Sequence, residues 1–238
     1  MEKKCIGIDV GGTTVKIGIF ETDGTLVYKW EVPSRKEENG AYILPDVAAS
    51  IRKKLNEQGI PMDAVIGAGM GFPGPVQPDG YVEVCVNLGW RDLNPQKILS
   101  ELLDGMPVRS GNDANVAALG EMWQGGAQWN NSASWSPWRG IGSGIVVDNK
   151  VFVGSTGAAG EIGHMCVNPK ETERCTCGNY GCLEQYCSDT GLVHTAQLVL
   201  EERPEEPSLL RDGEITPKAI CQAAKKGDAA ATEVLDRF

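Results

Sequence analysis

The beginning of the chain alternates β-type runs with short turns, and this pattern restricts the fold more than any other feature. Residues 5–8, 15–20 and 26–32 are rich in residues that favour strands. Gly11-Gly12 and Asp23-Gly24 separate these runs. Connections this short join antiparallel neighbours, because parallel strands need a long crossover. The sequence therefore predicts three antiparallel strands at the start of the fold.

Helices and strands alternate after this start. Ile43, Val47, Ile51 and Leu55 recur at helical spacing and predict a helix over residues 41–58. The next predicted elements are strands over residues 65–71 and 108–110 and helices over residues 95–103 and 114–123. Three strands followed by this alternation indicate an α/β fold.

A second glycine-rich strand pair follows in the other half of the chain. Gly142-Ser143-Gly144 precedes an apolar run, and residues 148–150 have the composition of a hairpin turn into residues 151–153. This arrangement is similar to the opening hairpin. It suggests two related α/β domains, residues 1–118 and 119–238, that face each other across a central cleft.

The charge balance excludes several classes of function. The chain has 22 Lys and Arg against 32 Asp and Glu, a net charge of −10, which argues against a nucleic-acid or anionic membrane surface. No run of about 18 apolar residues is present, so no membrane span is expected. Asp9 interrupts the first apolar stretch, which disfavours a secretory signal. We expect a cytoplasmic protein.

A histidine and three cysteines form a candidate metal site. Three thiolates and one imidazole are the ligand set of closed, tetrahedral structural zinc sites. The candidate ligands, within a motif that covers residues 164–182, are His164, Cys175, Cys177 and Cys182. A disulfide framework is the alternative, but the Cys175-Thr176-Cys177 spacing disfavours a bridge between those two cysteines. Cys166 and Cys187 are interpreted as structural thiols.

Three further groups of polar residues are candidates for chemistry. In the turn from Asp9 to Thr14, two glycines admit an anion, Thr13 and Thr14 supply hydroxyls, and Asp9 can hold hydrated Mg²⁺; the alternative is an ordinary hairpin turn. Asp113 precedes a predicted helix and is either its cap or a general base, with Asn112 on a substrate hydroxyl.

Glu161 and Glu184 flank the metal motif. A metal that closes this loop would fix both carboxylates, and fixed carboxylates bind vicinal hydroxyls of a sugar well. The alternative is that both are solvated loop charges.

Residues 129–139 do not fit the pattern around them. They hold three of the six tryptophans and show no strand or helix period, and Pro137 would interrupt either element. Read in a shifted frame, and with a TCA codon for Ser134, residues 134–138 are compatible with Met-Val-Thr-Leu-Gly. We therefore hypothesise that compensating frameshifts, or sequence errors, scrambled this segment.

Taken together and in order, five motifs closely resemble those of the ROK family (repressors, open reading frames, kinases), above all its bacterial glucokinase branch. They lie at residues 9–13, 71–76, 111–115, 160–164 and 175–184, and the resemblance covers nearly the whole chain except residues 129–139. The resemblance implies an actin-like ATPase fold with two RNase-H-like α/β domains, and a sugar and ATP in the cleft between them.

The resemblance also implies roles for individual residues. Asp113 would take the proton from the sugar 6-hydroxyl. The sugar-binding residues would be Gly71, Asn87, Asn112, Asp113, Glu161, His164 and Glu184. The residues near the ATP phosphates and Mg²⁺ would be Asp9, Gly11, Gly12, Thr13, Thr14, Gly140 and Gly142. His164 would bind both zinc and sugar, and homodimers are usual in the family.

The chain departs from the family pattern in two places. The family has a strand and a second phosphate loop where this chain retains only Gly140-Ile141-Gly142. Family members also continue for several dozen residues beyond Phe238, so we expect the second domain to be incomplete and the chain to be truncated.

Three functions are consistent with these observations. The first is ATP-dependent phosphorylation of a hexose, with glucose ahead of N-acetylmannosamine, fructose or allose. The second is an inactive, zinc-containing remnant that still binds sugar. The third, a repressor, is disfavoured because the resemblance places the DNA-binding region before the first glycine-rich loop, which starts here at Asp9, and because the chain is acidic.

Overall fold

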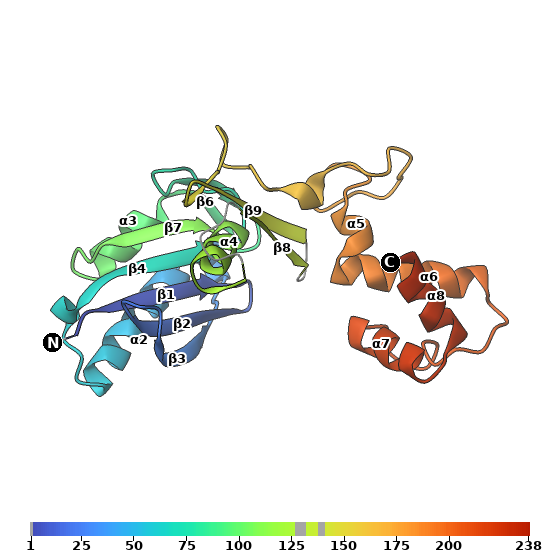
Figure 1. Cartoon of the computed structure of the whole chain (residues 1–238), viewed down its shortest axis with the longest axis horizontal. Coiled ribbons are helices and arrows are strands. Elements are labelled where there is room, and N and C mark those ends of the chain that lie inside the picture. The colour runs from blue at the N-terminus through green and yellow to red at the C-terminus, as the bar shows by residue number, and fades with distance from the viewer. Residues whose placement is uncertain (1, 127–131, 138–140) are drawn as a thin grey trace. The chain divides into compact units, whose positions relative to one another are not determined.

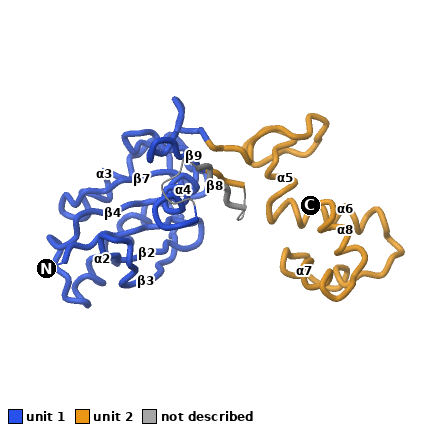
Figure 2. Tube along the Cα trace, in the orientation of Figure 1, with its two compact units in different colours: residues 1–134, 144–159 blue, residues 135–143, 160–238 orange. Residues whose placement is uncertain are grey.

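The computed structural model describes residues 2–126, 132–137 and 141–238 (Figure 1). It divides into two compact units, one of residues 1–134 and 144–159 and one of residues 135–143 and 160–238 (Figure 2). The domain boundary expected after residue 118 stays a prediction.

A five-stranded sheet in the order β3-β2-β1-β4-β7 forms the centre of the first unit. Strands β1 (Lys4–Val10), β2 (Thr14–Glu21) and β3 (Leu26–Pro33) are antiparallel neighbours, as the sequence predicts. Strands β4 (Val65–Phe72) and β7 (Val108–Asn112) run parallel to β1. The predicted α/β class is confirmed.

Helices cover both faces of this sheet. Helices α2 (Ile43–Glu57) and α3 (Pro95–Leu102) pack on one face, with the short helices α1 (Glu37–Gly40) and η1 (Met62–Ala64) in the connections. Helix α4 (Asp113–Gln124) packs against β4 and β7. It lies on the opposite face, because successive strand residues alternate: Met70 packs into the core, whereas a side chain at Gly71 would contact α4.

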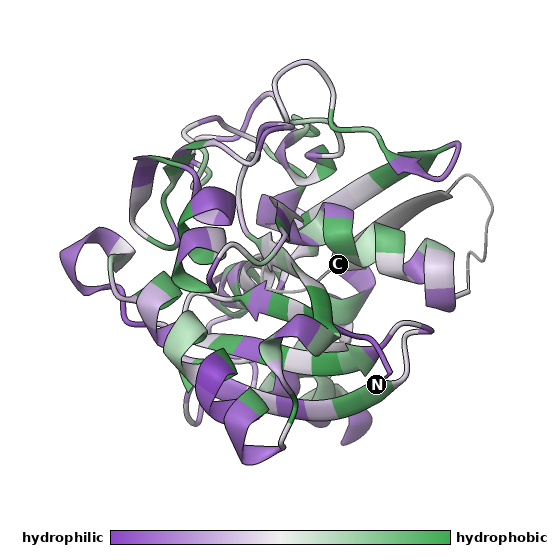
Figure 3. Cartoon of the chain, turned by 90° about the vertical axis from the view of Figure 1, so that its left-hand side faces the viewer, coloured by the Kyte–Doolittle hydropathy of each residue, from purple (hydrophilic) through white to green (hydrophobic). Residues whose placement is uncertain are grey.

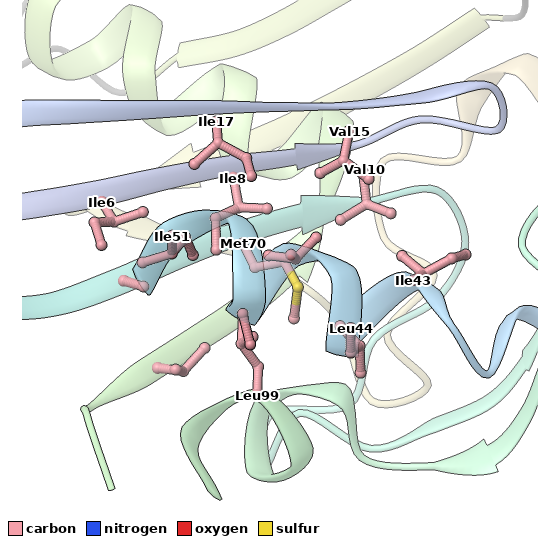
Figure 4. Close-up of a cluster of buried hydrophobic side chains, with 14 of the residues drawn as sticks. Ile6, Ile8, Val10, Val15, Ile17, Ile43, Leu44, Ile51, Met70 and Leu99 are labelled. Carbon is pink, nitrogen blue, oxygen red and sulfur yellow. The ribbon is translucent and has the colours of Figure 1, made fainter. Parts of the chain in front are cut away.

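The main core lies between the sheet and α2 and α3. Ile6, Ile8 and Met70 from the strands meet Ile51 from α2 and Leu99 from α3 (Figure 4). All five are at most 4% exposed. Strands β1 and β4 are largely hydrophobic, whereas the buried residues of α2 recur along one side of a helix that also carries hydrophilic residues; hydrophobic and hydrophilic residues alternate along the helices in Figure 3. This pattern is what burial of one helix face requires.

A small hairpin that the sequence analysis did not predict lies between β4 and α3. Its strands are β5 (Val82–Cys85) and β6 (Trp90–Leu93). The Trp90 side chain is buried, and its ring meets the ring of Phe72 edge to face with 5.3 Å between centroids. The hairpin thereby fixes the turn that contains Asn87 against the end of β4.

A three-stranded sheet has the order β10-β9-β8. It consists of β8 (Ser132–Pro137), β9 (Ile141–Val147) and β10 (Lys150–Val151). The expectation that residues 129–139 form no strand is therefore wrong for residues 132–137. Pro137 is the last residue of β8, which is an edge strand, and edge strands are where proline occurs in sheets. Residues 129–131, 138 and 139 lie outside the described residues.

The hairpin turn predicted at residues 148–150 is confirmed. Asp148 and Asn149 both have positive φ, at 49° and 60°, as a type I′ turn between antiparallel strands requires.

The rest of the second unit contains a loop region and a helical cluster. Its elements are η2 (Ile162–His164), α5 (Glu184–Cys187), α6 (Asp189–Glu202), α7 (Pro217–Lys225) and α8 (Ala229–Arg237). Ala196, Val199 and Ile220 lie in the shared core of the last three helices. Across the part of the chain that the structure describes, no helix is long and apolar enough to cross a membrane.

The first unit should lose substantial stability when its core is truncated. Ile51 is fully buried, so Ile51→Ala should lower the free energy of unfolding by about 2–5 kcal/mol through lost burial and the cavity left behind. Ile66 is 52% exposed, and Ile66→Ala should cost less than about 1 kcal/mol. Urea denaturation of both variants tests this, and equal losses would contradict it.

Candidate active site and metal centre

The carboxyl ends of three parallel strands bring the first group of predicted site residues together. Asp9 of β1 pairs in register with Gly71 of β4, and Phe72 of β4 pairs with Asn112 of β7. A Cβ added at Gly71 would lie 3.5 Å from the Cα of Asp113. Ligands of open α/β sheets bind at this edge. Asp9, Gly71, Asn112 and Asp113 are therefore neighbours in space.

Asn112 holds the junction between β7 and α4. Its Oδ1 accepts a hydrogen bond of 3.1 Å from the Asn115 N–H and caps α4, and its amide group donates to the Gly74 carbonyl at 3.2 Å. Asn112 is 7% exposed, so both contacts lie in a protected environment. The side chain thus ties the helix start to the loop after β4. It still has a second N–H and an oxygen lone pair for a ligand.

Because Asn112 caps the helix, the carboxylate of Asp113 is not needed for that purpose. Asp113 is accessible to solvent, and its Oδ1 accepts from the neighbouring Ala114 N–H at 2.8 Å. Desolvation by the surrounding protein and the negative charge of Asp9 hold the pKa of Asp113 above its usual range. A carboxylate with a raised pKa is a stronger base, and solvent access lets a substrate reach it.

Hydrogen bonds define the turn between β1 and β2. The Gly11 N–H donates to the Thr14 carbonyl at 3.0 Å. The Ser34 hydroxyl donates to the Gly11 carbonyl at 2.6 Å, and the Ser34 N–H donates to the Thr13 carbonyl at 2.9 Å. A Cβ at Gly11 would lie only 2.9 Å from the Thr14 carbonyl oxygen, so the turn needs glycine there. A Cβ at Gly12 would be 3.8 Å from the Asn87 carbonyl oxygen. The β5–β6 turn therefore lies beside this loop.

Two residues near this edge were not singled out by the sequence analysis. Lys16 pairs with Asp9 across the β1–β2 ladder, and its Nζ lies 3.9 Å from Asp9 Oδ2. Cys85 is buried, its Sγ donates to the Pro73 carbonyl at 2.9 Å, and burial followed by the charge of Asp113 raises its pKa. Register across the hairpin was the signal that could have identified Lys16.

The four predicted metal ligands converge in the second unit. The nitrogen and sulfur donor atoms of His164, Cys175, Cys177 and Cys182 all lie within 4.8 Å of one another. Cys177 Sγ is 3.6 Å from Cys182 Sγ, and Cys175 Sγ is 3.8 Å from His164 Nδ1. A tetrahedral site with Zn–S bonds of about 2.3 Å places neighbouring sulfurs about 3.8 Å apart. The arrangement fits a tetrahedral zinc ion.

The pKa values of two of these thiols are shifted in opposite directions. Desolvation and hydrogen bonds from the two other cysteines raise the pKa of Cys182 to about 12. For Cys177, hydrogen bonds, first of them from the Asn179 N–H, outweigh desolvation and lower the pKa. A divalent cation among the sulfurs would favour thiolates at all three, because metal binding displaces thiol protons.

Two carboxylates flank this cluster on different sides. His164 directs Nδ1 toward the sulfurs, and its Nε2 lies 4.0 Å from Glu161 Oε2. Glu184 Oε1 lies 3.8 Å from Cys175 Sγ and accepts a 3.3 Å hydrogen bond from Thr176 Oγ1. A carboxylate beside the second nitrogen of a ligand histidine orients the ring. Glu161 and Glu184 thus lie beside two of the candidate metal ligands, His164 and Cys175.

Tight turns bring the cysteines to one point. The Cys175 N–H donates to the Asn179 carbonyl, and the Gly178 N–H donates back to the Cys175 carbonyl, both at 2.9 Å. Gly181 has φ +68°, and a Cβ there would lie 1.9 Å from the Asn168 carbonyl oxygen. Only glycine permits this approach of the two chain segments.

The predicted site residues thus form two groups, one in each unit. The first unit holds Asp9, Gly11, Gly12, Thr13, Thr14, Gly71, Asn87, Asn112 and Asp113. The second unit holds Glu161, His164, Glu184, the three cysteines and Gly142, which lies in β9. Gly140, predicted near the ATP phosphates, lies outside the described residues.

Comparison with known proteins identifies the family of this chain. The profile of the ROK family matches residues 5–238, which is nearly the whole sequence. The chain belongs to the ROK family. Its resemblance to that family, inferred from five motifs, is confirmed.

Relatives in the ROK family include both kinases and repressors. The chain is 40% identical to a glucokinase of Halalkalibacterium halodurans over 98% of this chain and 72% of the relative. It is 32% identical to a xylose repressor of Caldicellulosiruptor bescii over 93% of this chain, but spans only 56% of that relative.

Among solved structures, a ROK family glucokinase from Streptomyces griseus, determined with glucose and AMPPNP, matches with a TM-score of 0.77 and 31% identity. The match covers 97% of this chain and 74% of that one. The ROK chain has the actin-like ATPase fold of these kinases.

The metal centre should be needed for folding of the loop around it. Cys177→Ser removes one of four ligands, so we expect the zinc content to fall from about one ion per chain and the folded yield to fall with it. Metal analysis of protein purified without chelator measures this. Cys221→Ser, at an exposed position on α7, is the control. Unchanged zinc and yield in Cys177→Ser would contradict a structural metal.

The pKa of Asp113 should depend on Asp9. Desolvation is the larger cause of its raised pKa, and the negative charge of Asp9 adds to it, so Asp9→Asn should lower the Asp113 pKa without returning it fully to the usual value. Carboxyl NMR titration of the labelled protein measures this. Asp63→Asn, at the far end of β4, is the matched control and should leave the Asp113 pKa unchanged. Equal effects of both variants would exclude the coupling.

Proposed function

We propose that this ROK protein transfers the γ-phosphoryl group of ATP to a hexose, with glucose as the substrate and glucose 6-phosphate as the product. Membership of the ROK family and the kinase relatives support a sugar kinase. The glucokinase relative and the glucose-bound neighbour favour glucose among hexoses. The observation that carries the proposal is the carboxylate of Asp113 at the carboxyl edge of the sheet. It is accessible, its pKa is raised, and Asn112 rather than Asp113 is the N-cap of α4.

Asp113 is the proposed general base. Its carboxylate would accept the proton of the sugar 6-hydroxyl as the hydroxyl oxygen attacks the γ-phosphorus in line. The bond from the γ-phosphorus to the β,γ-bridging oxygen breaks, and ADP leaves. Positioning and charge neutralisation supply most of the catalysis in such transfers, and general bases contribute about 10²–10⁴-fold. The fixed junction between β7 and α4 provides this positioning, because Asn112 ties the first turn of α4 to the loop after β4.

The remaining site residues are proposed to bind the two substrates. Asn112, Asn87 and the backbone at Gly71 would contact sugar hydroxyls from the first unit, and Glu161, His164 and Glu184 would do so from the second. Because Glu161 faces His164 Nε2 and Glu184 faces Cys175, a metal ion would fix both carboxylates. Zinc is the proposed ion, and it supplies structural rigidity rather than a reaction step.

The glycine turn is proposed to approach the ATP phosphates. Gly11, Gly12, Thr13 and Thr14 offer small residues and hydroxyl donors, and Lys16 adds a positive charge beside Asp9. The carboxylate of Asp9 is exposed, with 60% of its side chain accessible, and fits a hydrated Mg²⁺ ion, which retains most of its waters in proteins. Gly140 and Gly142 remain proposed phosphate neighbours.

The repressor relatives support an alternative. A chain that keeps the sugar-binding residues but not phosphoryl transfer would bind a hexose without turnover. Other hexoses, namely N-acetylmannosamine, fructose and allose, remain alternative ligands. Calorimetry with each sugar and a coupled ATP assay separate these functions. Binding without turnover favours the remnant, and binding of another hexose in preference to glucose would redirect the substrate assignment.

Asp113→Asn should remove transfer while it keeps sugar binding. We expect the turnover rate to fall by about 10²–10⁴-fold and the affinity for glucose to change little, because Asn112 maintains the helix cap. Asp63→Asn, which alters a carboxylate at the opposite end of β4, should retain wild-type turnover. Turnover that persists in Asp113→Asn would exclude Asp113 as the base.

A further inference from the structure

Cys166, which is not one of the four metal ligands, lies directly opposite the ligand Cys182. The two residues form an isolated antiparallel β-bridge. Two backbone hydrogen bonds enclose the pair: the Val167 N–H donates to the Gly181 carbonyl at 2.7 Å, and the Leu183 N–H donates to the Met165 carbonyl at 2.9 Å. Cys166 and Cys182 are therefore a non-hydrogen-bonded cross-strand pair.

This type of pair has a geometry that a disulfide can span. Residues opposite each other at such a position have Cα atoms about 4.5 Å apart and side chains on the same face. Disulfides join cysteines with Cα separations of about 4.4–6.8 Å. A bond between Cys166 and Cys182 would therefore need a side-chain rotation rather than a shift of the backbone.

We propose that Cys166 and Cys182 are a redox-sensitive pair, and that their oxidation to a disulfide removes one ligand from the metal centre and releases the zinc ion. The proposal about zinc release rests on the zinc site proposed above. The pairing of the two cysteines rests on the β-bridge alone, so the two parts can fail separately.

The exposure of the two sulfurs sets the order of events. Cys166 is exposed, whereas Cys182 is fully buried, so a peroxide reaches Cys166 first. Hydrogen peroxide oxidises the Cys166 thiol to a sulfenic acid and releases one water. The Cys182 sulfur then attacks the sulfenic sulfur: the S–S bond forms, the S–O bond breaks, and the hydroxide takes a proton and leaves as the second water. The peroxide accepts two electrons, one from each cysteine.

A competing disulfide exists within the ligand set itself. Cys177 Sγ lies 3.6 Å from Cys182 Sγ, and Cys177 is also exposed. That distance is the one that two ligands of a shared ion adopt, and both sulfurs are committed to the metal while it is bound. Cys166 is the exposed thiol next to the cluster that the metal does not hold, which favours it as the first sulfur to be oxidised.

Loss of Cys182 as a ligand would reach the proposed sugar site. Leu183 and Glu184 follow Cys182 directly, and Glu184 contacts Cys175 and Thr176. Without the metal these contacts lose the ion that fixes them, because zinc binding and folding of such a loop are coupled. Oxidation should therefore weaken hexose binding, and a reductant with added zinc should restore it.

The experiment uses the zinc-loaded full chain, its Cys166→Ser variant and the control Cys221→Ser, which removes an exposed thiol on α7. Each is titrated with hydrogen peroxide while a chromogenic chelator reports released zinc, and peptide mass mapping identifies the disulfides. We expect wild type and Cys221→Ser to release zinc together with a Cys166–Cys182 disulfide, reversibly on addition of dithiothreitol and zinc. Cys166→Ser should release zinc several-fold more slowly.

Two results would overturn the proposal. One is equal release from Cys166→Ser and wild type, and the other is a map in which Cys182 pairs only with Cys175 or Cys177. Zinc is measured before oxidation, so a chain without zinc counts against the metal centre. In that case the map still tests the Cys166–Cys182 pair.

Discussion

The register of three parallel strands is the constraint on which the first group of site residues depends. Because β1, β4 and β7 end at one edge, residues separated by about a hundred positions in sequence become neighbours. Asp9, Gly71 and Gly111 share one line across the sheet, and Asn112 follows one residue further along β7. The core between the sheet and α2 and α3 fixes that register, since a slip by one residue would turn Ile6, Ile8 and Met70 away from it. Burial on one face of the sheet therefore positions polar groups at its end.

The second group depends on a different kind of constraint. The segment from His164 to Cys182 has little regular structure. Turns, the β-bridges Cys166–Cys182 and Arg174–Tyr180, and the convergence of four candidate ligand atoms hold its residues. Few apolar side chains are buried there, so hydrophobic packing cannot supply the order that β1 or α2 obtains from the core. The proposed metal ion would supply that order by a few strong bonds. Because one set of ligands would hold the whole segment, oxidation of the neighbouring Cys166 thiol would disturb all of it.

Much of the first unit could be predicted from local patterns. The three opening strands, the helix around Ile43–Leu55 and the strands predicted over residues 65–71 and 108–110 are expressed by periodicity or by residue type, and the structure has them, with β7 two residues longer than predicted. In the second unit, residue type likewise indicated the four candidate metal ligands that the structure brings together. The β5–β6 hairpin could not be predicted, because its strands have four residues each and Trp90 is buried by tertiary packing with Phe72. The strand β8 was missed because Pro137 suggested an interruption, whereas an edge strand tolerates it. Lys16 was overlooked because it meets Asp9 across the β1–β2 ladder, and no fixed spacing in the sequence marks such a pair.

The fold does not by itself separate a sugar kinase from a sugar-binding repressor, because both occur among the ROK relatives of this chain. The proposed metal centre, with its two neighbouring carboxylates, would serve hexose binding in either case. Under the proposed function, Asp113 is the residue that phosphoryl transfer needs in addition. A carboxylate that only caps a helix is best fully ionised and bonded to backbone N–H groups, which lowers its pKa. In this chain Asn112 has taken the capping contact, and desolvation together with Asp9 raises the pKa of Asp113. The hydrogen bond that Asp113 accepts from the Ala114 N–H does not offset these two effects, and a raised pKa is what the proposed role as general base requires.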